Sequence, residues 1–415
     1  MLQIDHIYEF LYQELFKDFE FWSLSNGVPK LGQLTIHDIS IFTSRLVSDK
    51  IIFSYDQEPA IKQLIGPYLD IFTWDQKYST DELIELEKNN SLPYDIKISK
   101  DRLDNVIEEL RKRTSPTSYT LITSELSKDI DSLSEKYNTK KLYYFFHGFA
   151  ALDWYRGHYA LNYNKSIQKS YKYDFISFNR IITDDRSYRI YFVSLLKESG
   201  LLDKGQISFN VTDNLFDDWR DEVANPNTKL SEQARQHAER HLTDVDKLII
   251  DGSELHGSAS ADIPRGNDAF WHVVTETVFY YDKLHLTEKI FKPIVSKQPF
   301  MLLAASGNLA YLKSYGFKTF DSIIDESYDN IVDNDLRTEA VVRQLHWYCN
   351  LTPDEKTDII QQLEPIIQHN FHHFYGEFKH IITRELLDNT KTLFQSIGYN
   401  DSHINYKNIY HVLTQ

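Results

Sequence analysis

The residues between 271 and 290 combine a carboxylate, a hydroxyl and an ammonium group at close spacing. An apolar run, Trp271–Thr275, ends in Glu276, and after a loop Thr287, Glu288 and Lys289 begin a predicted helix. The first turn of a helix exposes main-chain N–H groups that have no helical partner, and such a turn binds anions. Lys289 adds a positive charge there, and Glu288 can accept hydrogen bonds from ribose hydroxyls. Together these groups suit a nucleoside diphosphate.

The same helix has a simpler interpretation. On motif length alone, it is an ordinary capped helix on which Glu288 and Lys289 form a solvent-exposed pair. Pro293 lies too deep for the first turn, so it predicts a kink or the end of a first helical segment. The next apolar run, Pro299–Leu303, leads into small residues ending at Gly307, where a ligand can approach the main chain closely.

A second polar segment follows a predicted strand that ends at Asn179. Arg180 comes directly after it, and Arg186 lies near the start of the next predicted helix. Arginine forms bidentate hydrogen bonds with phosphate oxygens, so the segment is suited to a phosphate group. Asp184 and Asp185 interrupt the basic run. The alternative is that the arginines pair with these two acids on a helix surface.

Two carboxylates follow a predicted strand, Ile51–Tyr55, in the N-terminal half. Asp56 and Glu58 lie at its carboxyl end, where open α/β sheets bind their ligands, and Pro59 stiffens the turn. A carboxylate at this edge can act as a general base. The alternative is an acid that caps the following helix.

His147 and Gly148 follow another apolar run and are candidate cleft residues. A tight turn at Gly148 would let His147 face a cleft. Aromatic residues follow at Trp154 and Tyr155, where they can stack on a sugar or base. The alternative is that these aromatic residues pack a domain junction.

Four histidines in a late predicted helix have in part the spacing of metal ligands. The first and third are four residues apart, but no glutamate accompanies them in an HExxH arrangement, and phenylalanines alternate with them. We therefore expect a packing face and no metal site. The histidines are His369, His372, His373 and His380, and the phenylalanines are Phe371, Phe374 and Phe378.

Short β-rich runs alternate with longer helical patterns, which is the rhythm of parallel α/β units. The runs form two series, so we predict an α/β fold with two Rossmann-like sheets. The first series is Ile51–Tyr55, Thr120–Ser124 and Leu142–Phe146, and the second is Tyr173–Phe178, Gln206–Asn210, Lys247–Ile250, Trp271–Thr275 and Pro299–Leu303. From Asn334 onward the pattern is helical, with a break where Thr352 or Asp354 can cap the next helix.

Length and local composition predict two domains. The chain has 415 residues, whereas a domain commonly has roughly 100–200. A polar and aromatic segment at residues 156–165 has no clean period, which places the junction near residues 155–170. We predict an N-terminal domain at 1–160, a second domain at 161–350, and C-terminal helices at 351–415 that pack back on the first domain.

Composition argues against several classes of function. The 61 acidic and 45 basic residues give a formal charge of -16, which disfavours nucleic acid and anionic membranes as partners. Any phosphate site must therefore be a local basic pocket. Cys349 is the one cysteine of the sequence, so no intramolecular disulfide forms, which fits the cytoplasm. We expect no signal peptide, and the longest apolar runs are far shorter than the roughly 20 residues of a membrane helix.

The order of strand, Glu276, loop, Leu286–Ile290, helix, strand and small-residue turn resembles the donor-binding region of the α-1,3-fucosyltransferase family. It is still more similar to uncharacterised glycosyltransferases of bacteria and their viruses that share this half. The resemblance spans about residues 173–325 and is most specific around residues 275–306. The family pattern has Glu-Asn where this chain has Glu276 and Thr277, so the sugar stays undefined.

The resemblance implies a GT-B fold, in which two Rossmann-like domains face one another across a cleft. It implies inverting, metal-independent transfer of a sugar from a nucleotide sugar to an acceptor hydroxyl, without a cofactor. Glu288 would then contact the donor ribose and Lys289 its diphosphate. Asn179, Arg180 or Arg186 would contact the donor phosphates.

In the similar enzymes the general base is an acid from the N-terminal domain, which makes Glu58 the candidate here. Asp56 and Glu125 are next in order. Two alternatives stay open, a non-catalytic binding protein of the same fold and a viral transferase that modifies DNA. The acidic balance argues against the second. The sequence leaves undefined the donor base, the sugar, the acceptor, the stereochemical outcome and the oligomeric state.

Overall fold

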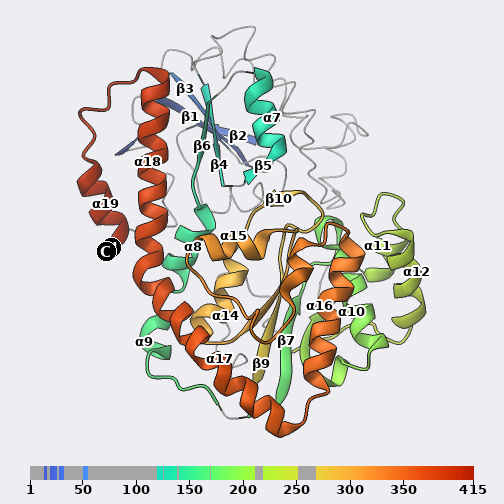
Figure 1. Cartoon of the computed structure of the whole chain (residues 1–415). Coiled ribbons are helices and arrows are strands. Elements are labelled where there is room, and N and C mark those ends of the chain that lie inside the picture. The colour runs from blue at the N-terminus through green and yellow to red at the C-terminus, as the bar shows by residue number, and fades with distance from the viewer. Residues whose placement is uncertain are drawn as a thin grey trace. The chain divides into compact units, whose positions relative to one another are not determined.

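The computed structural model divides the chain into two compact units (Figure 1). The first unit comprises Met1–Phe149 together with His380–Gln415, and the second comprises Ala150–Lys379. The structure describes residues 14–15, 19–25, 28–31, 50–54, 119–124, 126–137, 140–168, 170–210, 218–250 and 268–415. The predicted domain bounds, 1–160, 161–350 and 351–415, stay a prediction.

The first unit contains a mixed sheet with the strand order β2-β1-β3-β4-β6. Its strands are β1 (Phe19–Ser25), β2 (Val28–Leu31), β3 (Lys50–Ser54), β4 (Tyr119–Thr123) and β6 (Lys140–Tyr143). β1 runs antiparallel to both β2 and β3, β3 runs antiparallel to β4, and β4 runs parallel to β6. The predicted parallel pairing is therefore right for β4 and β6 but wrong for β3, because an apolar run indicates a strand but not its direction.

Helices from both ends of the chain belong to the first unit. They are α7 (Lys128–Tyr137), α18 (Lys379–Ile397) and α19 (Tyr406–Thr414). The side-chain amide of Asn389 on α18 donates to the main-chain oxygen of Tyr143 at 2.9 Å, which joins α18 to the end of β6. A hydrogen bond of 2.9 Å between His380 Nδ1 and the Tyr410 hydroxyl joins α18 to α19. Part of the predicted C-terminal helical segment thus packs with the N-terminal strands.

The second unit contains a four-stranded parallel sheet with the order β11-β9-β7-β8. Its strands, β7 (Tyr173–Asn179), β8 (Gly205–Phe209), β9 (Ala269–Thr275) and β11 (Phe300–Leu303), agree with four of the predicted runs. Every residue of β9 and β11 is buried, as expected of strands that are covered on both faces. The fifth predicted strand, Lys247–Ile250, is wrong, since Leu248 forms an isolated antiparallel bridge with Phe209.

Two groups of helices pack around this sheet. In the first group, α10 (Tyr188–Glu198) packs against α12 (Glu232–His241) and α16 (Asn334–Cys349). In the second, α14 (Phe291–Ser296) packs against α9 (His158–Asn162) and α17 (Pro353–His373). In the view of Figure 1, α10 and α16 lie to the right of β7 and β9, and α14 lies to the left. The described part of this unit also contains α11 (Trp219–Ala224) and α15 (Asn308–Ser314).

The start of α17 agrees with the sequence prediction. Thr352 accepts a hydrogen bond from the main-chain N–H of Glu355, whose carboxylate accepts one from the main-chain N–H of Thr352. This reciprocal capping box satisfies two N–H groups that the helix itself leaves without partners. α17 continues through a π-helical turn, Phe374–Phe378, into α18. Among the helices that the structure describes, none has the length and apolar character needed to cross a membrane.

Candidate functional site

In the second unit, the connection after β7 and the connection after β9 lead to opposite edges of the sheet. β7 is followed by β8 on one side of it, whereas β9 is followed by β11 on the other side. In open parallel sheets, ligands bind outside the carboxyl ends of the strands at such a switch point. Asn179 is the last residue of β7, and Glu276 directly follows β9. The fold therefore brings two of the sequence candidates to the edge where a ligand is expected.

Glu276 is the centre of a buried polar cluster with Thr287, Glu288 and Lys289, which we call the Glu276 cluster. The Glu276 carboxylate accepts hydrogen bonds from the main-chain N–H of Thr287 at 3.1 Å and from its hydroxyl at 2.5 Å. A third hydrogen bond, of 3.0 Å, comes from the main-chain N–H of Thr277. These bonds join the end of β9 directly to the segment that precedes α14.

The segment after Thr287 begins with a short turn and not with the first turn of an α-helix. Thr287 caps a single 3₁₀ turn, Glu288–Ile290, and α14 begins only at Phe291. Pro293 is the third residue of α14, where a main-chain N–H would have no partner within the helix. The proline that is too deep for a helix beginning at Glu288 is therefore acceptable in this shorter helix.

Lys289 forms an ion pair inside the Glu276 cluster. Its ammonium group lies 2.9 Å from Oε1 of Glu288 and 3.4 Å from the hydroxyl of Thr287. The side chain of Glu288 is 4% exposed, whereas that of Lys289 is 27% exposed. The alternative of a solvent-exposed surface pair is therefore wrong for Glu288. Lys289 is the member of the pair that a ligand in solvent can reach.

The environment of Glu276 favours its neutral form. Burial raises the pKa of the carboxyl group above its ordinary value of 4.5, while the charge of Lys289 and the hydrogen bonds from Thr287 and Thr277 act in the opposite direction. The nearby charge of Glu288 adds to the increase.

Asn179 occupies a buried position at the end of β7. Its main-chain N–H donates to the Ser208 hydroxyl at 3.0 Å, and its side-chain amide donates to the Ser177 hydroxyl at 3.1 Å. Oδ1 of Asn179 has no hydrogen-bond partner among the described residues. Arg180 and Arg186 are both half-buried, and Arg186 ends a 3₁₀ turn that precedes α10.

Asp185 has partners that the sequence did not indicate. Its carboxylate forms an ion pair with Lys229 and accepts a hydrogen bond of 2.9 Å from the Tyr281 hydroxyl. Lys229 also contacts the Tyr281 hydroxyl. Tyr281 belongs to the loop between β9 and β10 (Lys283–Leu284), so these contacts fasten that loop to the start of α10.

Tyr188 and Arg189, the first two residues of α10, support the switch point. The Tyr188 hydroxyl donates to the main-chain oxygen of Glu276 at 2.6 Å. Arg189 donates to the main-chain oxygens of Ile181 and Thr275, each at 2.7 Å, so it joins the loop after β7 to the end of β9. The described hydrogen bonds of Arg189 are therefore donated to main-chain carbonyl groups.

Arg337 on α16 holds the neighbouring loops in a similar way. It is 2% exposed and donates to the main-chain oxygens of Phe279 at 3.0 Å and Ala304 at 2.8 Å. Burial lowers the pKa of its guanidinium group to about 10, so it is still charged at neutral pH. No local motif in the sequence marks Arg337, because its partners are far away along the chain.

Tyr155 adds a contact to the Glu276 cluster from the start of the second unit. Its buried hydroxyl lies 3.5 Å from the main-chain oxygen of Glu288, to which it donates. The Tyr155 main-chain oxygen accepts a hydrogen bond of 2.8 Å from the Tyr375 hydroxyl. Of the two predicted roles, packing and stacking on a ligand, the described contacts of Tyr155 fit packing.

The chain matches no protein-family model, no curated protein and no solved structure.

Other sequence candidates lie elsewhere or cannot be placed. Glu58, Asp56 and Glu125 lie outside the described residues. His147 and Gly148 belong to the first unit, where both are buried in the first turn of α8 (Phe146–Trp154). The predicted tight turn at Gly148 is wrong, because its main-chain N–H donates to the Phe145 oxygen at 3.1 Å and the chain continues as a helix.

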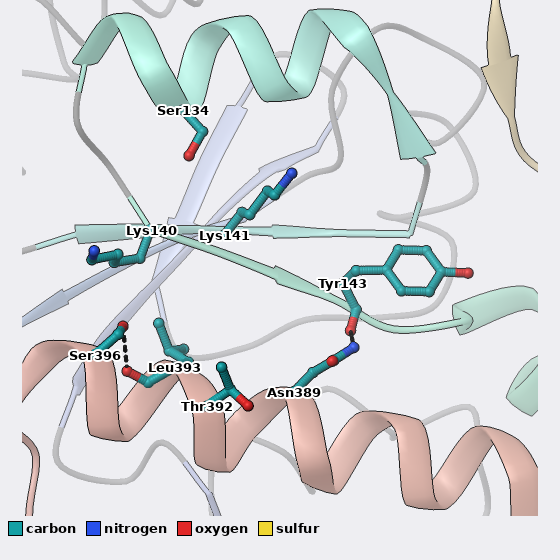
Figure 2. Close-up of a pocket in the computed structure, with 8 residues that line it drawn as sticks. All are labelled: Ser134, Lys140, Lys141, Tyr143, Asn389, Thr392, Leu393 and Ser396. Atoms are coloured by element: carbon teal, nitrogen blue, oxygen red, sulfur yellow. Dashed lines mark hydrogen bonds between the residues drawn. The ribbon is translucent and has the colours of Figure 1, made fainter.

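A pocket of about 320 Å³ lies in the first unit between α7, β6 and α18 (Figure 2). Much of its polar lining is already used. Lys141 forms an ion pair with Asp131, and the hydroxyls of Thr392 and Ser396 donate to main-chain oxygens of their own helix. The Asn389 amide is bonded to Tyr143, as the dashed line in Figure 2 shows. We therefore give this pocket no functional role.

Proposed function

We propose that the protein is a glycosyltransferase whose second unit binds a nucleotide-sugar donor. The observation that carries the proposal is the Glu276 cluster next to the switch point of a parallel sheet. Cation, carboxylate and hydroxyl groups at this place match the diphosphate and ribose of such a donor. The resemblance of residues 173–325 to donor-binding regions leads to the same function.

Donor binding would exchange partners within the Glu276 cluster. Lys289 now neutralises Glu288, and its side chain is partly exposed, so its ammonium group can turn toward a diphosphate. Glu288 would then accept hydrogen bonds from the ribose hydroxyls in place of the lysine. Burial raises the pKa of Glu276, and the charge of Lys289 and the hydrogen bonds from Thr287 and Thr277 act against this increase.

The segment after β7 supplies further groups for the donor. Arg180 and Arg186 are half-buried cations near the same sheet edge, and we assign them to the phosphates. The Oδ1 atom of Asn179 is a buried acceptor without a partner among the described residues, so it can receive a donor hydroxyl. Tyr188, Arg189 and Arg337 act as positioning residues, because their donors hold the main chain of the site.

We further propose a GT-B architecture with inverting, metal-independent transfer and a cytoplasmic location. Glu58 is the proposed general base on the acceptor side. Burial raises the pKa of the Cys349 thiol to about 12, which keeps it an unreactive thiol at neutral pH. The parallel sheet of the second unit is what supports the proposed architecture, since the described sheet of the first unit is mixed.

A thermal-shift panel tests donor binding directly. The full chain, kept in EDTA, is heated with UDP, GDP, TDP, ADP and CMP sugars, because a ligand that binds the native state raises the melting temperature. We expect one base to give a clear increase and the matching nucleoside without phosphates to give little. If every nucleotide sugar leaves the melting temperature unchanged, the donor-binding proposal fails. Transfer measured with the selected donor should persist in EDTA.

A further inference from the structure

Three side chains that the function does not use converge at the far end of α10. Glu198 is the last residue of α10, and His237 and His241 lie one turn apart on α12, which packs against α10 (Figure 1). Each side chain offers one ligand atom, and the three atoms lie within 4.8 Å of one another. The two imidazole rings are stacked with their centroids 4.4 Å apart. We call these residues the Glu198 cluster.

The hydrogen bonds of Ser194 fix the tautomer of His237. The Ser194 hydroxyl donates its proton to the main-chain oxygen of Tyr191 at 2.8 Å. With the hydroxyl proton on that oxygen, the contact of 2.8 Å with Nδ1 of His237 is a hydrogen bond that the ring N–H donates to Ser194. A neutral His237 then carries its lone pair on Nε2, which lies 3.1 Å from Oε2 of Glu198.

Two acceptors at this distance repel each other unless a positive species lies between them. A proton on Nε2 is one such species, and a metal ion that draws in both atoms is another. The position of His241 distinguishes the proton from the metal ion. Its Nε2 lies 3.8 Å from Oε1 of Glu198, too far for a hydrogen bond, and has no hydrogen-bond partner among the described residues although it is buried from solvent.

We propose that the Glu198 cluster binds a divalent transition-metal ion, with Zn²⁺ as the best match. Zn²⁺ takes imidazole nitrogen at about 2.0–2.1 Å in tetrahedral sites, so neighbouring ligand atoms are about 3.4 Å apart. The two nitrogen-to-oxygen distances, 3.1 Å and 3.8 Å, lie on either side of this value. The Glu198 side chain is 51% exposed, so a water molecule can complete the coordination.

The surroundings support ligation. Ligating histidines commonly donate their other ring N–H to a fixed acceptor, as His237 does to Ser194. His237 and His241 lie one turn apart on α12 with stacked rings, so both imidazoles face Glu198 from one helix. An ion here would join α10 to α12. It would be a structural ion, because α10 separates Glu198 from Tyr188, at the Glu276 cluster, by about 15 Å.

Another histidine pair provides a matched control. His369 and His373 have the same spacing on α17, and their rings are parallel at 5.7 Å. However, Nε2 of His369 lies 3.1 Å from the Gly316 oxygen, and Nε2 of His373 lies 2.7 Å from the Tyr315 oxygen. Both nitrogens must therefore carry protons and donate them, so neither can ligate a metal. The spacing of the histidines along the helix therefore does not distinguish the pair on α12 from the pair on α17.

The test uses tag-free full-length protein that has been stripped with EDTA and dialysed. Co²⁺ replaces Zn²⁺ as a spectroscopic probe, because its visible absorption reports tetrahedral coordination, and calorimetry follows Zn²⁺ itself. We expect one ion per chain, with Glu198→Gln and His237→Gln each weakening binding at least tenfold, while His369→Gln leaves it unchanged. Glu198 is exposed, so its variant keeps the fold even if His237→Gln does not.

The same measurements can overturn the proposal. Absence of Co²⁺ absorption in the wild-type protein would mean that a proton alone occupies the space between His237 and Glu198. Equal binding by Glu198→Gln would place the ion elsewhere. Loss of binding in His369→Gln would point to the pair on α17. The readouts do not involve sugar transfer, so they are independent of the proposed function.

Discussion

The main-chain N–H and the side-chain hydroxyl of Thr287 both donate to the carboxylate of Glu276, at 3.1 Å and 2.5 Å. One carboxyl group thus joins the end of β9 to the turn that precedes α14. Glu276 also accepts from the main-chain N–H of Thr277, and the Thr287 hydroxyl accepts from Lys289, so we propose that Glu276 and Thr287 position Glu288 and Lys289. In the proposed function, the donor contacts therefore fall on Glu288 and Lys289.

The raised pKa of Glu276 predicts a pH-dependent contribution to stability. Since the folded-state pKa is above the unfolded value, Glu276 contributes most below its ordinary pKa of 4.5, and this contribution is lost as the pH rises through the folded value. We expect the free energy of unfolding of the wild type, relative to Glu276→Gln, to fall as the pH rises from 4. Urea unfolding followed by tryptophan fluorescence measures it, because Trp271 is fully buried in this unit. A relative stability that increases with pH would show that Lys289 and the three donors outweigh burial.

Replacement of Lys289 tests the ligand-facing cation. We expect Lys289→Ala to weaken donor binding and turnover about tenfold or more, because a charge-assisted contact with a phosphate is lost. Lys313→Ala is a matched control, since Lys313 also pairs with a largely buried glutamate, Glu326, at 3.3 Å but lies on α15. The effect should also exceed that of Lys283→Ala, in which a buried lysine beside the Tyr281 ring is removed. Equal mild effects in all three variants would refute the assignment.

Tyr188→Phe separates positioning from general stability. The change removes the hydroxyl that donates to the Glu276 oxygen at 2.6 Å but keeps the ring stacked on Phe279, with centroids 3.8 Å apart. A buried carbonyl loses its partner, so we expect about 1–3 kcal/mol lower stability and weaker donor binding. Tyr191→Phe, on the same helix, removes a bond to the Glu339 side chain and should lower stability without changing donor affinity. Calorimetric donor titrations on both variants decide, and equal donor affinities would contradict a positioning role for Tyr188.

The sequence predicted the second sheet better than the first. β7, β8, β9 and β11 are apolar runs bounded by polar or turn residues, and burial on both faces produces that pattern. The direction of β1, β3 and β4 depends on long-range pairing, which a local pattern does not encode. Lys247–Ile250 is also an apolar run, which is why the sequence predicts a strand there, but it forms only a single bridge, at Leu248.

The residues of the candidate site also divide into those that a local sequence signal predicts and those that it does not. Glu276 and Thr287 were found because a carboxylate after a strand and a capping residue before a helix are local signals. Arg337 was missed because it reaches Phe279 and Ala304 across the fold. The pairing of Glu198 with His237 and His241 was missed too, since a helix-to-helix contact brings together residues 39 positions apart.

Glu58 is the proposed general base. It lies outside the described residues, so this assignment rests on the sequence. In an inverting transfer the acceptor oxygen attacks from the side opposite the departing diphosphate, and a base must take its proton as the sugar bond breaks. Such a base contributes about 10²–10⁴-fold in rate, so Glu58→Gln should lower turnover by that factor. Donor affinity should stay nearly unchanged, because the loss is confined to the transition state. Kinetics with the donor found in the thermal-shift panel, beside Asp56→Asn and Glu125→Gln, measure this. Full turnover in Glu58→Gln would move the role of base to whichever of the other two acids proves essential.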